Sequence, residues 1–222
     1  MILEDLVILF DIDNTLLDND RIQADLGDYL EQEYGAQARD RYQEIFEEIR
    51  GNLGYADYLG ALERFRVETM HDPRILRMAS WLVDYPFADR LYPGALDAVR
   101  HARRFGLPVV LSDGDAVFQP HKVVRSGLWP VFNDDVLIYI HKEQELGDVE
   151  RLYPARHYIM VDDKLRILAA MKQVWGPRLT TIFPRQGHYA TDPAELAKYP
   201  PADLAIDHIS EFVHHDLAAL AA

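Results

Sequence analysis

The fold of this chain is decided by the stretch Leu6-Val7-Ile8-Leu9-Phe10-Asp11-Ile12-Asp13-Asn14-Thr15, in which an apolar run gives way at once to polar residues. A short, unbroken run of aliphatic and aromatic residues is typical of a β-strand that is covered on both faces. The strand is expected to end at Phe10, so that Asp11 and Asp13 follow it directly. Residues two apart in an extended segment point to the same side, so both carboxylates are expected to face one volume.

Similar apolar runs recur along the chain and alternate with helical patterns. Strands that alternate with helices indicate right-handed crossover units and a parallel sheet with helices on both faces. The expected fold class is therefore α/β, a doubly wound, Rossmann-like parallel sheet. Further strands are expected at residues 107–111, 136–140, 158–161, 179–183 and 204–206, and helices at 94–105, 117–127, 143–152, 165–175 and after Asp207.

Residues 18–90 break this alternation. They hold four stretches with apolar residues at spacings of three and four, and no strand pattern, which predicts a block of amphipathic helices. A length of 222 residues fits one core domain with a smaller inserted unit. We therefore predict a catalytic core of residues 1–17 and 91–222 and an all-helical cap of residues 18–90. The cap helices are expected at 22–34, 38–50, 55–70 and 74–85.

The composition excludes several classes of protein. The 37 acidic and 23 basic residues give a net charge of −14, which repels a nucleic-acid backbone, so no nucleic-acid partner is expected. The chain has no Cys, which excludes a disulfide framework and a thiolate nucleophile and fits a reducing cytoplasm. No targeting signal is seen in residues 1–10, and the apolar run there is too short to span a bilayer. We expect a cytoplasmic protein without a membrane partner.

Polar residues follow four of the expected strands. Besides Asp11 and Asp13, they are Ser112-Asp113, His141-Lys142 and Asp162-Asp163. Ligands bind outside the carboxyl ends of strands in an open parallel sheet, so these side chains are expected to converge. Carboxylates packed together without a cation would repel one another. A magnesium ion, which prefers oxygen ligands and completes its shell with water and substrate phosphate, resolves this repulsion.

Each group taken alone has a simpler interpretation. Asp and Asn after a strand commonly form turns or helix caps, and Asp162-Asp163 in front of a helix is well placed as a cap. A single Lys after a strand is usually solvated. The combination of carboxylates, hydroxyl, ammonium and carboxylates at four successive strand ends favours a functional site over turn chemistry.

These motifs resemble those of the haloacid dehalogenase-like hydrolase superfamily, in the branch with a helical cap after the first motif. The first motif, Asp-x-Asp-x-Thr, stands here as residues 11–15, and Ser112-Asp113, Lys142 and Asp162-Asp163 resemble the second, third and fourth. One departure is Glu143, since the family usually has Pro directly after the Lys. Lys122 is a competing ammonium, although it lies within a helical pattern.

The resemblance implies a role for each residue. Asp11 is the expected nucleophile, which forms an aspartyl-phosphate, and Asp13 the expected general acid and then general base. Ser112, Asp113 and Lys142 are expected to bind phosphate. Asp11, Asp13 (through its backbone carbonyl), Asp162 and Asp163 are expected to hold Mg²⁺, and the adjacent Asp162 and Asp163 leave open which of them is the inner-sphere ligand.

The implied activity is a magnesium-dependent phosphatase acting on a small-molecule phosphate ester. Dehalogenase relatives lack a carboxylate equivalent to Asp13, because a halide leaves without a proton. A haloacid dehalogenase, a phosphomutase and a catalytically silent binding protein are the alternatives. Arg185 and His188, which follow the fifth run, and the cap residues Arg21, Arg64 and Arg66 are candidate substrate contacts, although solvated surface charge is the simpler interpretation. Neither the substrate nor the oligomeric state follows from the sequence.

Overall fold

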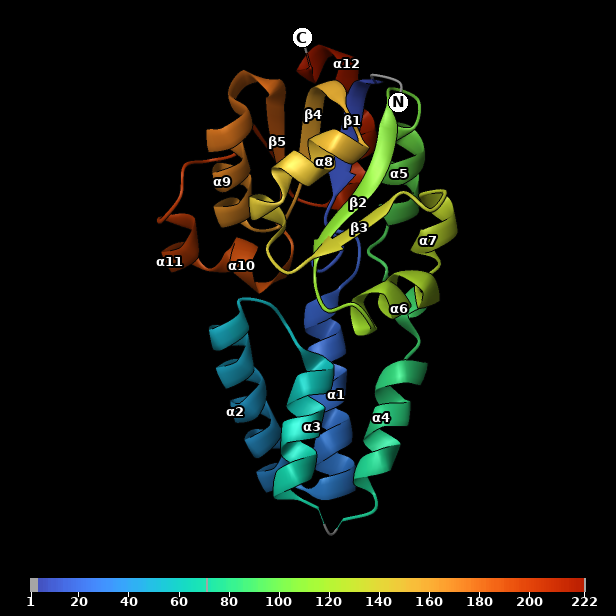
Figure 1. Ribbon diagram of the computed structural model, residues 1–222, viewed down its shortest axis with the longest axis vertical. Coiled ribbons are helices and arrows are strands. Elements are labelled where there is room, and N and C mark those ends of the chain that lie inside the picture. Colours follow the sequence, from blue (N-terminus) through green and yellow to red (C-terminus); the bar gives the residue numbers. More distant parts are fainter. Residues whose placement is uncertain (1–3, 71, 222) are drawn as a thin grey trace.

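The computed structural model describes residues 4–70 and 72–221 of the chain. Its core is a six-stranded sheet in the order β3-β2-β1-β4-β5-β6, in which every neighbouring pair is parallel (Figure 1). The predicted α/β fold class is therefore confirmed. The strands are β1 (Glu4–Phe10), β2 (Leu107–Asp113), β3 (Val136–Tyr139), β4 (Ala155–Val161), β5 (Leu179–Pro184) and β6 (Leu204–Ile206).

The central strand β1 is buried on both faces, which explains its continuous apolar sequence. Ile8 and Phe10 belong to the core on one face of the sheet, and Val7 and Leu9 to the core on the other. Burying a side chain of this size contributes about 1.5 to 3 kcal/mol. The first face is covered by α5 (Ala95–Ala102), α6 (Phe118–Arg125), α7 (Leu128–Val131) and α12 (Leu217–Leu220), and the second by α8 (Leu146–Leu152) and α9 (Leu165–Trp175).

Four helices lie together beyond the carboxyl ends of the strands, at the end of the molecule opposite the N- and C-termini (Figure 1). They are α1 (Asn19–Tyr34), α2 (Ala36–Leu53), α3 (Tyr58–Glu68) and α4 (Ile75–Asp84). The chain leaves for these helices and returns at adjacent points. The backbone N–H of Asp18 donates to the carbonyl of Arg90 at 2.8 Å, and that of Tyr92 to the carbonyl of Leu16 at 2.9 Å. These contacts support the predicted division of the chain, which stays a prediction.

Two of the expected helices are in part 3₁₀ segments, whereas the others differ from expectation by at most a few residues at their ends. The expected helix 143–152 is divided into a 3₁₀ turn, η2 (Lys142–Gln144), and α8, because the Asp113 carboxylate accepts the Lys142 backbone N–H and turns the chain inward. The expected C-terminal helix is a 3₁₀ segment, η4 (Ile209–His214), followed by α12. The remaining short elements are η1 (Phe87–Arg90), η3 (Gly176–Arg178), α10 (Gly187–Thr191) and α11 (Pro193–Leu196).

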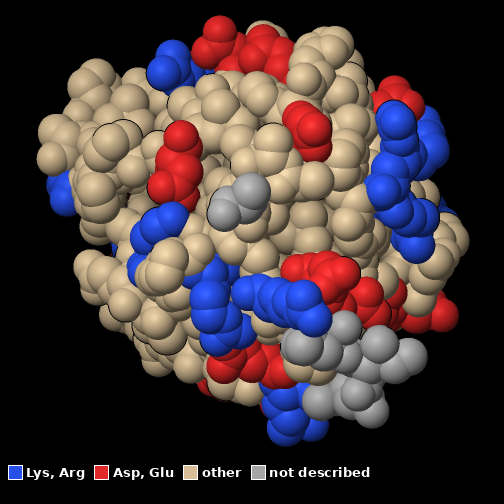
Figure 2. Space-filling view, turned by 90° about the horizontal axis from the view of Figure 1, so that it is seen from above, with Lys and Arg blue, Asp and Glu red and all other residues tan. Residues whose placement is uncertain are grey.

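The surface at the end opposite the four helices carries both signs of charge. Lys and Arg lie next to Asp and Glu around its rim, with uncharged residues between them (Figure 2). Within the described residues, no helix has both the length and the apolar character needed to cross a membrane.

Candidate active site

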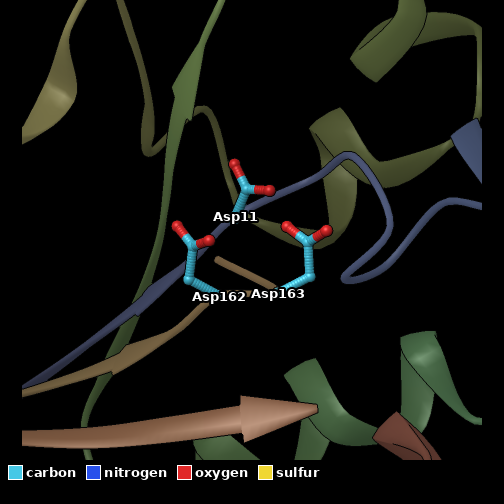
Figure 3. A group of neighbouring side chains, drawn as sticks. All are labelled: Asp11, Asp162 and Asp163. Atoms are coloured by element: carbon cyan, nitrogen blue, oxygen red, sulfur yellow. The ribbon is translucent and has the colours of Figure 1, made fainter. Parts of the chain in front are cut away.

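The central strands bring three carboxylates together. Asp11 continues β1, with its N–H donating to the carbonyl of Val161 at 3.0 Å, and Asp162 and Asp163 follow the neighbouring strand β4. Each of the three Asp side chains offers one carboxylate oxygen, and these oxygens lie within 4.8 Å of one another (Figure 3). All three residues are buried. Segments separated by about 150 residues thus meet because β1 and β4 are adjacent in the sheet.

Lys142 compensates part of this negative charge. Its Nζ lies 2.6 Å from Asp11 Oδ1, to which it donates a hydrogen bond, and 2.7 Å from Asp162 Oδ2, with which it forms an ion pair. Burial by itself lowers the pKa of Lys142, but the carboxylates of Asp11 and Asp162 outweigh it and hold the pKa above its usual value. Lys142 is therefore a permanent ammonium inside the site.

The remaining negative charge favours a bound cation. Burial raises the pKa of Asp162 to about 6, although Lys142 opposes the shift, and burial raises the pKa of Asp163 well above its usual value. Asp162 Oδ1 accepts the backbone N–H of Lys164 at 2.8 Å. Neither carboxylate oxygen of Asp163 has a hydrogen-bond partner among the residues that the structure describes. Unpartnered buried carboxylates are costly, so these residues fit a hard divalent cation with oxygen ligands.

Hydrogen bonds from neighbouring side chains reach only one of the two carboxylate oxygens of Asp11 within the described residues. Its Oδ1 accepts hydrogen bonds from Lys142 Nζ and, at 3.1 Å, from Ser112 Oγ, which itself accepts from Gln119 Nε2 at 3.1 Å. In the described part of the chain no donor reaches Asp11 Oδ2. One oxygen therefore orients the carboxylate while the other keeps its lone pairs available for attack on an electrophile.

Asp113 contacts the site through the backbone. Its Oδ1 accepts the backbone N–H of Lys142 at 2.8 Å, and burial raises its pKa even though Lys142 opposes the shift. The carboxylate thereby fixes the segment that carries the Lys142 ammonium. The role predicted for Asp113 in phosphate binding stays a prediction.

The side chain of Asp13 lies apart from the other three carboxylates. Both of its oxygens accept from Lys122 Nζ, at 2.8 and 2.9 Å, and Oδ2 also accepts from Gln119 Nε2 at 3.4 Å. The two lysines considered from the sequence therefore both reach the site, on different carboxylates: Lys142 contacts Asp11, and Lys122 contacts Asp13.

A cavity of about 60 Å³ lies between the four helices and the strand ends. That is room for only a few water molecules, so the crevice is narrow in this structure. The core contributes Asp13, Asp113 and Lys164 to its wall, and α2 contributes Arg50. Arg50 is not among the site residues predicted from the sequence. Its position at the end of the expected helix 38–50 was the one sequence feature that could have indicated a place near the strand ends.

The other candidate substrate contacts separate into two groups. His188 lines the crevice, and its Nδ1 lies 2.7 Å from Asp20 Oδ1. Arg185 is exposed beside Asp207 at 3.5 Å and does not line the cavity. The three cap arginines pair with acidic neighbours outside the crevice: Arg21 with Asp25, Arg64 with Glu48 and Arg66 with Glu63. For these three residues the geometry favours surface charge.

Comparison with known proteins points to one family. The family model for haloacid dehalogenase-like hydrolases matches residues 6–174. A haloacid dehalogenase-like hydrolase from Burkholderia xenovorans LB400 is 60% identical, with a TM-score of 0.93 and coverage of 98% of this chain and 99% of that chain. No protein of curated function matches the chain.

More distant solved structures share the fold alone. L-2-haloacid dehalogenase from Xanthobacter autotrophicus is 17% identical, with a TM-score of 0.61 and coverage of 94% of this chain and 96% of that chain. The magnesium-bound HAD-hydrolase YfnB from Bacillus subtilis, whose structure reveals interdomain movement, is 16% identical, with a TM-score of 0.61 and coverage of 95% and 97%.

Proposed function

Because the chain belongs to the haloacid dehalogenase-like hydrolase family, it is a hydrolase, and we propose that it is a magnesium-dependent phosphatase acting on a small phosphorylated metabolite. The observation that carries this proposal is Asp13, a second carboxylate that lines the crevice two residues beyond Asp11. A halide leaves without a proton, whereas the alkoxide that leaves a phosphate ester needs one. Asp13 supplies a group for that transfer.

The proposed reaction has two steps. Asp11 Oδ2 attacks phosphorus, the aspartyl–phosphorus bond forms, the ester P–O bond breaks, and Asp13 gives its proton to the departing oxygen. Water then attacks phosphorus and passes a proton to Asp13, while the bond to Asp11 breaks and orthophosphate is released. Ser112 and Lys142 are the proposed ligands of the phosphoryl oxygens, and their contacts with Asp11 support this role.

The metal site of this proposal consists of Asp11, Asp162 and Asp163. We assign Asp163 as the inner-sphere ligand of the adjacent pair, because both of its oxygens are buried and unpartnered within residues 4–70 and 72–221, whereas Asp162 is engaged by Lys142 and by the Lys164 backbone. When bound, Mg²⁺ offsets the repulsion between the carboxylate and the anionic phosphoryl group.

Substrate access requires movement of the helices over the site. A cavity of about 60 Å³ is too small for a phosphorylated metabolite, so residues 18–90 are proposed to act as a lid that opens to admit substrate and then excludes water. The chain leaves the core at Asp18 and returns to it at Tyr92, and we propose these two adjacent segments as the hinge of the lid.

The test is phosphate release from p-nitrophenyl phosphate and from a panel of metabolite phosphates, with Mg²⁺ and with a chelator. We expect turnover that requires Mg²⁺ and is lost in Asp11→Asn, while Asp97→Asn, an exposed carboxylate on α5, keeps full activity. Chloride release from L-2-haloacids without metal would instead indicate a dehalogenase. Transfer of phosphate to a second hydroxyl would indicate a mutase, and inactivity on every compound a silent binding protein.

A further inference from the structure

Lys122 is a buried ammonium that the two proposed chemical steps do not use. It lies on α6, far in sequence from the carboxylate it contacts, and only 1% of its side chain is exposed. Its Nζ contacts both oxygens of Asp13 and, at 3.2 Å, Asn19 Oδ1. A Lys ammonium has three N–H donors, so each one has an acceptor and the group is fixed in direction.

The surroundings of this ion pair strengthen it. Lys122 Nζ lies 5.6 Å from the ring centre of Tyr58 and 5.7 Å from that of Phe118, and both rings are buried. Aromatic walls exclude water, and charges interact more strongly where water is excluded. Among these contacts of Lys122, Asp13 is the group that carries a charge.

Packing alone does not account for such a residue. A buried ion pair often stabilises a fold no more than apolar residues of the same volume would, because removing both charges from water is costly. A Lys–Asp pair at the wall of the crevice therefore points to a role in the chemistry of its carboxylate.

We propose that Lys122 is a positioning residue that acts through Asp13, an inference that rests on the proposed phosphatase function. When Asp13 gives its proton to the leaving oxygen, a carboxylate forms on Asp13 and its negative charge develops beside the Lys122 ammonium. In the substrate complex in which Asp13 carries the proton, the attraction grows as that proton leaves, which is the condition for accelerating the step. Water returns the proton to Asp13 in the second step, so the proton balance of the cycle is kept.

The same contacts join this pair to the helical cap. Asn19 is the first residue of α1, and its Oδ1 also accepts from Tyr58 Oη of α3 at 3.2 Å. The third acceptor of the Lys122 ammonium is thus in place only when the start of the cap lies against α6. The structure links the orientation of Asp13 to the closed position of the lid.

The test uses two aryl phosphates of similar shape that differ in how much their leaving group needs a proton. The value of kcat/KM covers every step up to loss of the leaving phenol. For Lys122→Met we expect kcat/KM to fall about 100-fold for phenyl phosphate, since general acid catalysis contributes ~10² to 10⁴. For p-nitrophenyl phosphate, whose phenolate leaves readily, we expect a fall of less than about ten-fold.

A control and a second variant separate this role from a structural one. Val123→Ala removes buried volume from the same helix without touching Asp13, and should lower Tm while leaving the ratio of the two kcat/KM values unchanged. Lys122→Gln keeps a donor of similar length but no charge; it should give an intermediate ratio, and it carries the test if the Met variant does not fold.

A double variant identifies the carboxylate through which Lys122 acts. In an Asp13→Asn background, Lys122→Met should leave the ratio of the two kcat/KM values unchanged. Three results would overturn the inference. In Lys122→Met, kcat/KM could fall equally for both substrates or not fall at all. In the Asp13→Asn background, Lys122→Met could change the ratio of the two kcat/KM values. Wild-type protein that hydrolyses neither of these substrates nor any metabolite phosphate of the panel with Mg²⁺ would instead refute the proposed function, and the inference with it.

Discussion

The charged residues of the strand ends and those of the four helices α1 to α4 are arranged in opposite ways. At the strand ends, Lys142 and Asp162 are 2% and 0% exposed and come from distant parts of the chain. On the cap, Arg66 and Glu63 are 53% and 67% exposed and lie three residues apart on one helix. Exposed pairs contribute about 0 to 1 kcal/mol, whereas removing one partner of a buried pair is strongly destabilising. The comparison indicates that the cap can vary its surface charge while the strand ends cannot.

The largest expected effect is that of Lys142→Met. Removing the ammonium leaves Asp11 and Asp162 buried without their cation, so the free energy of unfolding of the metal-free protein should fall by about 3 to 5 kcal/mol. Urea denaturation measures it. The matched cap variant, Arg66→Met, should change the free energy by less than about 0.5 kcal/mol. If both variants lost a similar free energy of unfolding, buried and exposed charges would not differ in their contribution to stability as we expect.

The next effect is the pH dependence of the metal-free protein. The pKa of Asp162 is about 6 when folded and has its ordinary, lower value when unfolded, so the folded state binds this proton more tightly. The resulting stability is present at low pH and is lost as the pH rises through about 6. We expect a decrease on the order of 2 kcal/mol between about pH 4 and pH 7, measured by urea denaturation with a chelator.

Asp162→Asn serves as the reference for that measurement, since its side-chain oxygen can still accept the Lys164 N–H. The variant should lack this component of the pH dependence. Saturating Mg²⁺ should reverse the trend in the wild type, because metal ligands must be ionised to bind. An identical pH dependence in wild type and Asp162→Asn would contradict the assignment.

A smaller effect is expected from Asp163→Asn. Replacing a buried carboxylate that has no partner in the described residues should stabilise the metal-free protein by about 1 kcal/mol. The variant should also lose the rise in Tm that Mg²⁺ gives the wild type, because ligand binding to the folded state is what raises it. Thermal unfolding with and without Mg²⁺ measures both changes. A variant that Mg²⁺ stabilises as much as the wild type would exclude Asp163 as the inner-sphere ligand.

The smallest effect on stability is expected from Arg50→Met, a variant of the helix α2. Arg50 pairs with Glu47 on the surface of α2, so unfolding should change by less than about 0.5 kcal/mol. Because its side chain lines the crevice, KM for a phosphorylated substrate should rise about ten-fold with kcat retained. Arg66→Met should alter neither constant. A loss of kcat instead would place Arg50 in the chemical steps.

The sequence was sufficient for the sheet and for much of the site, for one physical reason. Parallel strands end at a common edge, so an apolar run followed by polar residues predicts both the strand and the meeting place of its side chains. The structure brings together the residues that follow these runs, as expected: Asp11, Ser112, Lys142 and the Asp162-Asp163 pair.

The remaining residues depend on rotations that periodicity does not encode. Lys122 reaches Asp13 because of how α6 is turned about its axis, and its charge within a helical pattern favoured a solvated position. Arg50 lines the crevice because the C-terminal end of α2 faces the strand ends, and an amphipathic pattern does not state which end of a helix meets another unit. Both placements are set by packing between elements that are distant in sequence.

The chain leaves the core at Asp18 and rejoins it at Tyr92, and this arrangement affects how such a protein can change during evolution. Since the helical unit departs from the core and rejoins it at neighbouring points, its length and its number of helices can change without disturbing the pairing of any strand. New selectivity can then arise in those parts of the helical unit that do not hold Lys122, while the carboxylates at the strand ends are inherited unchanged.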